Sequence, residues 1–171
     1  MGQFHKSIDK RMDAFGVRID KVWKDTFDFE EEIHNFCVEK EAAFDRYHNF
    51  NVKTGEVLND PDIPETTKGM LEVQNDTLHA FIIKVAPEFS DMVYKSRAEI
   101  DEIQGFREIV IKGMQTMADY KKNAALADRT MTRFEQSLSK FEKDNEIIRN
   151  RIDTVKSGFG EAEKYYESLK N

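Results

Sequence analysis

Residues 8–47 read IDKRMDAFGVRIDKVWKDTFDFEEEIHNFCVEKEAAFDRY, and their apolar side chains recur at alternating steps of four and three residues. This spacing marks one face of an α-helix, and no proline interrupts it. The positions on this face, called the first seam below, are Ile8, Met12, Phe15, Ile19, Val22, Thr26, Phe29, Ile33, Phe36, Lys40, Ala43 and Tyr47. The sequence therefore predicts one continuous helix, over about residues 3–49, whose seam is buried against other helices.

The length of this helix indicates the shape of the molecule. At about 1.5 Å per residue the helix is about 70 Å long, whereas a compact domain of this size is only about 40 Å across. We therefore expect an elongated molecule. The composition agrees, because 35% charged and 39% hydrophobic residues with eight Gly and three Pro are typical of long-helix proteins.

Two further helices follow in the sequence. A loop is expected over residues 50–64, where Gly55 and two prolines lie. The second helix is expected over about residues 65–121 with a kink at Pro87, because proline removes a backbone hydrogen bond and clashes with the preceding turn. The third is expected over about residues 124–169, after a reversal near residues 121–124; one very long helix is the alternative. The prediction is a single all-α domain, an elongated antiparallel bundle of three long, kinked helices.

The second helix has a corresponding seam, which consists of Leu71, Leu78, Ile82, Val85, Val93, Ile100, Ile103, Phe106, Val110, Met114, Met117 and Tyr120. The third seam consists of Ala127, Met131, Phe134, Leu138, Phe141, Asn145, Ile148, Ile152, Val155, Phe159, Ala162, Tyr166 and Leu169.

The three seams together contain more apolar surface than three extended helices are expected to cover. We therefore predict an obligate homodimer, a six-helix bundle. Asn145 is a lone polar residue in the third seam, and such a residue usually fixes the register or the partner orientation at some cost in stability. The first helix has a surplus of three positive charges over residues 1–24 and a deficit of six over residues 25–49. Two antiparallel copies would pair these halves, unless the charges simply face solvent. The residues assigned to the dimer and core seam are Phe15, Ile19, Phe29, Ile33, Phe36, Phe134, Leu138, Phe141 and Asn145.

Several classes of function are disfavoured by the sequence. The formal net charge of −7 argues against nucleic-acid binding. There is no apolar run long enough to span a bilayer and no secretory signal, and one cysteine suits a reducing compartment. We therefore expect a cytoplasmic protein that can associate peripherally with a membrane. Two carboxylate-x-x-His pairs, at 31/34 and 45/48, lie about 21 Å apart on one helix and cannot share a metal. We expect no metal, no cofactor and no catalysis; a ferritin-type metal bundle is the least favoured reading.

Some local segments resemble the BAR (Bin/amphiphysin/Rvs) domain. Residues 25–36, DTFDFEEEIHNF, look like the first helix of amphiphysin-type BAR domains, and residues 111–121, IKGMQTMADYK, are similar to a segment late in the second helix. Residues 126–129, LADR, and 134–142, FEQSLSKFE, resemble the start of the third helix in sorting-nexin-type BAR domains. The likeness covers most of the chain in outline, but the chain is shorter than a usual BAR domain and acidic overall.

The resemblance implies a non-catalytic antiparallel homodimer that binds anionic phospholipid membrane and senses or shapes its curvature. The residues it implies for lipid contact are Lys6, Lys10, Arg11, Arg107, Lys112, Lys121, Lys122, Arg129 and Arg133. The alternative is a soluble coiled-coil adaptor or assembly subunit, which binds other coiled-coil proteins and no lipid. Lipid binding is therefore expected to separate the two hypotheses.

Overall fold

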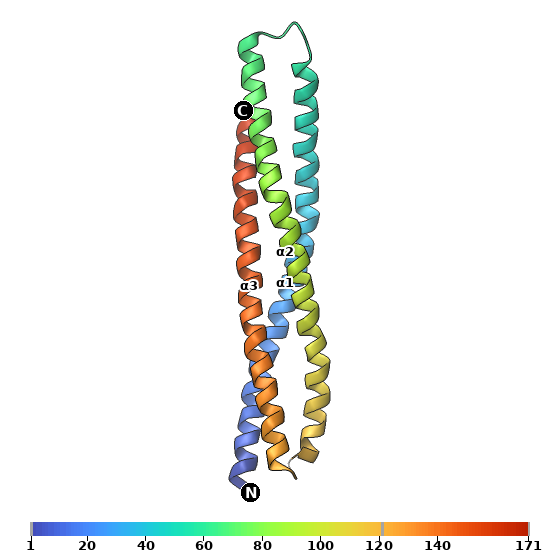
Figure 1. The fold of residues 1–171 in the computed structure, drawn as a ribbon, viewed down its shortest axis with the longest axis vertical. Coiled ribbons are helices and arrows are strands. Elements are labelled where there is room, and N and C mark those ends of the chain that lie inside the picture. The colour runs from blue at the N-terminus through green and yellow to red at the C-terminus, as the bar shows by residue number, and fades with distance from the viewer. Residues whose placement is uncertain (1, 121, 171) are drawn as a thin grey trace. The chain divides into compact units, whose positions relative to one another are not determined.

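The chain is all-helical in a computed structural model, which describes residues 2–120 and 122–170 and the side chains of residues 7–115 and 122–169. The three helices are α1 (Gly2–Leu58), α2 (Glu65–Tyr120) and α3 (Ala124–Lys170), and they pack against one another (Figure 1). No strand occurs among the described residues. The expected all-α bundle of three long helices is thus confirmed in this coarse form.

The helices contribute to two compact units. Unit 1 comprises Met1–Glu31 and Lys95–Asn150, and unit 2 comprises Glu32–Tyr94 and Arg151–Asn171. Each unit therefore contains a part of every helix. Unit 1 has seventeen Lys and Arg against seventeen Asp and Glu, whereas unit 2 has nine against sixteen, so the whole net charge of −7 belongs to unit 2.

The core of unit 1 is formed by the seams of its three helix segments. Phe134 of α3 stacks on Phe15 of α1 with ring centroids 5.8 Å apart, and meets Phe106 of α2 edge to face at 6.1 Å. Around these rings lie further fully buried side chains, among them Ile103 and Leu138. The aromatic pairs join all three helices, because each helix contributes a ring to one cluster.

The core of unit 2 is richer in aromatic rings. Phe159 of α3 lies at 5.4 Å from Phe36 and 5.1 Å from Phe44 of α1, and at 5.6 Å from Phe89 of α2. All three contacts are edge to face, the geometry that ring quadrupoles favour. Most of the phenylalanine side chains that the structure describes thus fill the space between helices.

Within each unit the contacts define helix directions. In unit 1, Arg11 contacts Glu135 and Arg18 contacts Glu142, so α1 and α3 run parallel with a constant offset of 124 residues. In unit 2, Glu32 pairs with Lys156 at the same offset. α2 runs antiparallel to α3, because later residues of one helix contact earlier residues of the other. Gly113 and Phe106 lie against Phe134 and Phe141 in unit 1, and Phe81 and Phe89 lie against Tyr165 and Phe159 in unit 2.

The first interhelical loop is shorter than the sequence predicts. The expected loop over residues 50–64 is wrong in its first part, since α1 continues to Leu58. The reason is that the four-three spacing of the first seam continues through Asn51, Thr54 and Leu58, all buried or half-buried. Gly55 is tolerated inside the helix at a cost of about 1 kcal/mol, and only the proline-rich segment ends it.

The second helix continues through its proline. Pro87 lies inside α2 and is exposed, so it does not end the helix. The kink that we expect there stays a prediction. The predicted break between the second and third helices is present, because α2 ends at Tyr120 and α3 begins at Ala124. Asn123 caps α3, since its Oδ1 accepts a hydrogen bond of 3.2 Å from the backbone N–H of Leu126.

The predicted seams are covered within a single chain. Every seam position whose side chain is described is buried or half-buried, and all nine residues assigned to the dimer and core seam are buried. Two seam positions, Met117 and Tyr120, lie outside the residues whose side chains are described. The seams therefore do not themselves require a second copy, and our reason for expecting an obligate dimer does not hold; the dimer stays a prediction.

Tyr47 offers a test of packing in unit 2. Its side chain is 1% exposed beside Tyr166, and its hydroxyl has no hydrogen-bond partner among the described residues. Burial raises the pKa of Tyr47 to about 12, with Glu163 adding to the shift. Because the folded pKa lies above the ordinary value of 10.0, ionisation of Tyr47 does not oppose folding below pH 10, and it lowers the stability increasingly as the pH rises from 10 to about 12.

We expect Tyr47→Phe to raise the free energy of unfolding by about 1 kcal/mol at neutral pH, because it removes an unpaired buried hydroxyl. The variant should also lose less stability than the natural protein between pH 10 and 12. Urea denaturation at neutral pH and at several values in this range measures both effects. Equal slopes for the two proteins above pH 10 would contradict the assignment.

Candidate functional site

Five of the nine cations that we predict for lipid contact lie near the turn between α2 and α3 in unit 1. Gly113 lies against Phe134, and Arg11 against Glu135, so residues near 10, 112 and 134 share one level of the bundle. Five of the predicted cations lie between this level and the turn or close to it. We call them the basic end, and they are Lys10, Lys112, Lys122, Arg129 and Arg133.

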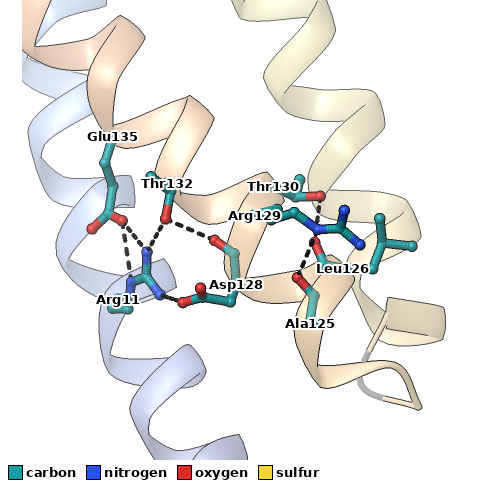
Figure 2. A network of polar contacts seen from close by, with 8 residues as sticks. All are labelled: Arg11, Ala125, Leu126, Asp128, Arg129, Thr130, Thr132 and Glu135. Carbon is teal, nitrogen blue, oxygen red and sulfur yellow. Dashed lines mark hydrogen bonds and ion pairs between the residues drawn. The ribbon is translucent and has the colours of Figure 1, made fainter.

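Arg11 has a different role from the one that the sequence predicts. Its Nη1 donates to Asp128 Oδ1 at 2.7 Å and its Nε to Glu135 Oε1 at 3.1 Å, while Nη2 reaches both Glu135 and the Thr132 hydroxyl (Figure 2). The hydrogen bond with Glu135 is the main cause that raises the pKa of Arg11 above its usual value, and burial acts against it. Arg11 therefore joins α1 to α3 and is not a free surface cation.

Because Arg11 pairs with Asp128 and Glu135, neither of these carboxylates is left to pair with Arg129. Asp128 and Glu135 are acidic neighbours of the α3 cations, and both are engaged by Arg11. Arg129 projects on the side of α3 away from Arg11, where its Nε donates to the backbone carbonyl of Ala125 at 3.3 Å (Figure 2). Arg133, one helical turn later, is on the same face of α3.

The basic end is exposed and unpaired. All five of its side chains are exposed, and none makes an ion pair with a carboxylate in the part of the chain whose side chains are described. By contrast, Arg18, Lys40, Lys140 and Lys156 all pair with glutamates. The basic end thus presents charge to solvent that no described acidic side chain neutralises directly.

The remaining predicted cations are placed differently. Arg107 lies over the rings of Trp23 and Phe27, with its guanidinium carbon 5.2 and 5.9 Å from their centroids, so part of its role is packing α2 on α1. Lys121 lies outside the described residues, and the side chain of Lys6 is likewise outside them.

Sequence reasoning missed an apolar element of the basic end. Leu126, in the first turn of α3, is 37% exposed between Lys122 and Arg129, and Ile111 of α2 is 44% exposed. A signal for Leu126 was present, since it lies one position before seam residue Ala127 and so outside the four-three spacing. Exposed apolar side chains beside cations suit the boundary between lipid headgroups and acyl chains.

Neither a metal-binding cluster nor a membrane-spanning helix occurs in the described part of the chain. Within the described residues, no three His, Cys, Asp or Glu side chains are grouped so as to hold a metal ion. The described helices also include none that is long and apolar enough to cross a bilayer.

Comparisons with known proteins identified no relative of this chain. The chain matches no family model, and searches of curated proteins and of solved structures gave no significant match. The resemblance to BAR domains therefore depends on the quoted segments alone.

Proposed function

We propose that this chain is a non-catalytic helical protein that binds anionic membrane surfaces through the basic end of unit 1. The observation that carries the proposal is the set of five exposed cations without a described carboxylate partner, next to exposed Leu126. Each Lys or Arg near an anionic leaflet contributes about 1 kcal/mol, so five suffice for reversible binding. Dimerisation and a response to curvature, which the BAR resemblance implies, extend the same proposal.

The distribution of charge supports this proposal. An acidic protein is repelled by an anionic membrane over distances comparable to the Debye length, about 8 Å at physiological salt. The net charge of −7 belongs to unit 2, whereas unit 1 is neutral overall. Electrostatic repulsion from an anionic membrane therefore opposes binding through the basic end of neutral unit 1 less than the net charge of the whole chain suggests.

We expect the variant Lys122→Glu/Arg129→Glu to bind at least tenfold more weakly to phosphatidylcholine vesicles that contain phosphatidylserine. The reason is that two attractive charges become repulsive at the centre of the proposed contact. The measurement is co-sedimentation at low salt, with phosphatidylcholine vesicles as the lipid control. Binding of the natural protein should fall as the salt concentration rises.

The matched control is Arg97→Glu/Lys143→Glu, which makes the same charge change in unit 1 on exposed residues away from the α2–α3 turn. This variant should keep most of the binding. If it loses as much binding as the first variant, net charge and not the basic end is responsible. If the natural protein does not sediment with phosphatidylserine vesicles at low salt, the membrane proposal is wrong.

A second candidate function, a soluble adaptor for other helical proteins, is favoured by a different surface. In unit 2 the exposed side chains of Val73, Ala80, Pro87 and Tyr94 recur at steps of seven residues on α2. Tyr94 is 78% and Val73 65% exposed, and a seven-residue apolar repeat is the pattern by which helices associate. Absence of vesicle binding would leave this candidate as the preferred one.

A further inference from the structure

Unit 1 contains a polar cavity that the basic end does not use. It has a volume of about 460 Å³ and lies between α1 and α3. The residues of its wall on which the argument depends are Lys21, Asp25 and Asp28 of α1, and Asn145, Glu146 and Arg149 of α3. The wall thus combines charged side chains with two apolar seam residues, Val22 and Phe29.

Asn145 is the buried polar group of this cavity. Its side chain is 6% exposed, and its Nδ2 donates a hydrogen bond of 3.2 Å to the backbone carbonyl of Val22. Because a carbonyl oxygen only accepts, this bond sets the orientation of the amide and leaves Oδ1 as an acceptor. Oδ1 has no donor among the described residues. Leaving a buried acceptor unpaired lowers stability, so the site favours a ligand that carries an N–H or O–H group.

The charges of the wall favour a cationic ligand. Asp25, Asp28 and Glu146 make no ion pair or hydrogen bond with any residue in the described part of the chain. Of the two basic wall residues, Arg149 is held over the ring of Phe29, with its guanidinium carbon 4.8 Å from the centroid. Lys21 is exposed. A further wall carboxylate, Glu142, pairs with Arg18. The cavity therefore has a surplus of negative charge beside an unpaired acceptor.

A metal ion is a poorer fit than an organic cation. No three acidic, His or Cys side chains in the described residues are close enough together to coordinate a metal. An alkylammonium group supplies three N–H donors and one positive charge, so it satisfies both the carboxylates and the amide oxygen.

We propose that this cavity binds a primary alkylammonium group, which donates a hydrogen bond to Asn145 Oδ1 and is balanced in charge by Asp25 and Glu146. A small polyamine and the side chain of a lysine in another protein both carry this group. The proposal is independent of membrane binding, because the wall residues are distinct from those of the basic end.

The test is an NMR titration that follows the side-chain amide signals of Asn145. The probes are spermidine, a capped lysine (Nα-acetyl-lysine methylamide) and the capped norleucine analogue, which lacks the ammonium. We expect saturable shifts with spermidine and capped lysine and none with capped norleucine. Tighter binding of spermidine by tenfold or more identifies a small polyamine as the ligand, and equal or tighter binding of capped lysine identifies a protein side chain.

Two variants with the same change of charge make the test specific. Asp25→Asn/Glu146→Gln should weaken binding at least tenfold, whereas Asp13→Asn/Glu108→Gln, on exposed residues of unit 1 outside the cavity wall, should leave it unchanged. If the first variant does not fold, as judged by circular dichroism, Asp25→Asn alone replaces it. The proposal is wrong if neither amine gives a saturable shift, if both variants weaken binding equally, or if magnesium chloride produces the same shift at the same concentration.

Discussion

Replacing Glu163 by alanine is expected to lower the free energy of unfolding by about 2 kcal/mol, because it leaves a buried ammonium without its main partner. Lys40 occupies a position of the first seam, and its side chain is only 5% exposed. Its Nζ pairs with Glu163 of α3 and lies 5.2 Å from the ring centroid of Phe159 and 5.4 Å from that of Phe36. The loss should be smaller than the 3–5 kcal/mol typical of buried pairs, because Glu163 is partly exposed and Glu39 remains at 3.3 Å.

Replacing Lys40 itself should lower the free energy of unfolding much less than removing its partner. We expect Lys40→Met to change the stability by less than about 1 kcal/mol, since an unbranched apolar side chain suits the same space among phenylalanine rings. In the Lys40→Met background, Glu163→Ala should then cost almost nothing. Urea denaturation of the four proteins of this double-mutant cycle measures a coupling of about 2 kcal/mol.

The matched control for this cycle is Glu161→Ala, an exposed glutamate of the same helix with no ion pair among the described residues. It should change the stability by no more than about 0.5 kcal/mol. A loss as large as that of Glu163→Ala would show that helix charge or propensity, and not the pair with Lys40, is responsible.

The second large effect is expected at Gly113, where alanine should lower the free energy of unfolding by about 2 kcal/mol. A Cβ at this position would lie 2.7 Å from Cε2 of Phe134 and still closer to its Cζ, far inside van der Waals contact. The ring of Phe134 is 8% exposed between those of Phe15 and Phe106, so it has little room to move. Overpacking of this kind costs about 1–3 kcal/mol and outweighs the usual gain from replacing a helical glycine.

Gly105 provides a control of opposite sign. It lies in the same helix and a Cβ there meets nothing within 4 Å, so Gly105→Ala should raise the stability by about 0.5–1 kcal/mol. The double variant Gly113→Ala/Phe134→Leu should recover part of the loss, because the smaller side chain leaves space for the methyl group. Urea denaturation of the three variants tests this contact; a stabilising Gly113→Ala would contradict it.

Much of the fold could be predicted from the spacing of apolar residues. The seam positions whose side chains are described are buried or half-buried in all three helices, because a side chain's position around a helix follows directly from residue number. Even Lys40 and Thr26, the polar members of the first seam, are buried with it. The error at residues 50–58 arose because Gly55 and polar seam positions resemble a loop, whereas packing against neighbouring helices overrides such weak local preferences.

The candidate sites were predicted less well. Positive charges near the α2–α3 turn could be recognised from the sequence, but the role of Arg11 could not. Its partners Asp128 and Glu135 lie more than a hundred residues away along the chain. The cavity beside Asn145 was missed for the same reason, since the sequence shows a lone Asn in a seam and not what its amide contacts.

The sequence by itself determined that the chain is helical, which face of each helical segment is buried and roughly where the first two helices begin, because helical periodicity and proline are local properties. The structure decided between a reversal and one very long helix after residue 120. Only the tertiary structure decided which charges are neutralised and which stay free, because that depends on the register between helices. The parallel offset of 124 residues between α1 and α3 brings Arg11 to Glu135 and Arg18 to Glu142. The same packing leaves the basic end unpaired and Asn145 Oδ1 without a donor among the described residues.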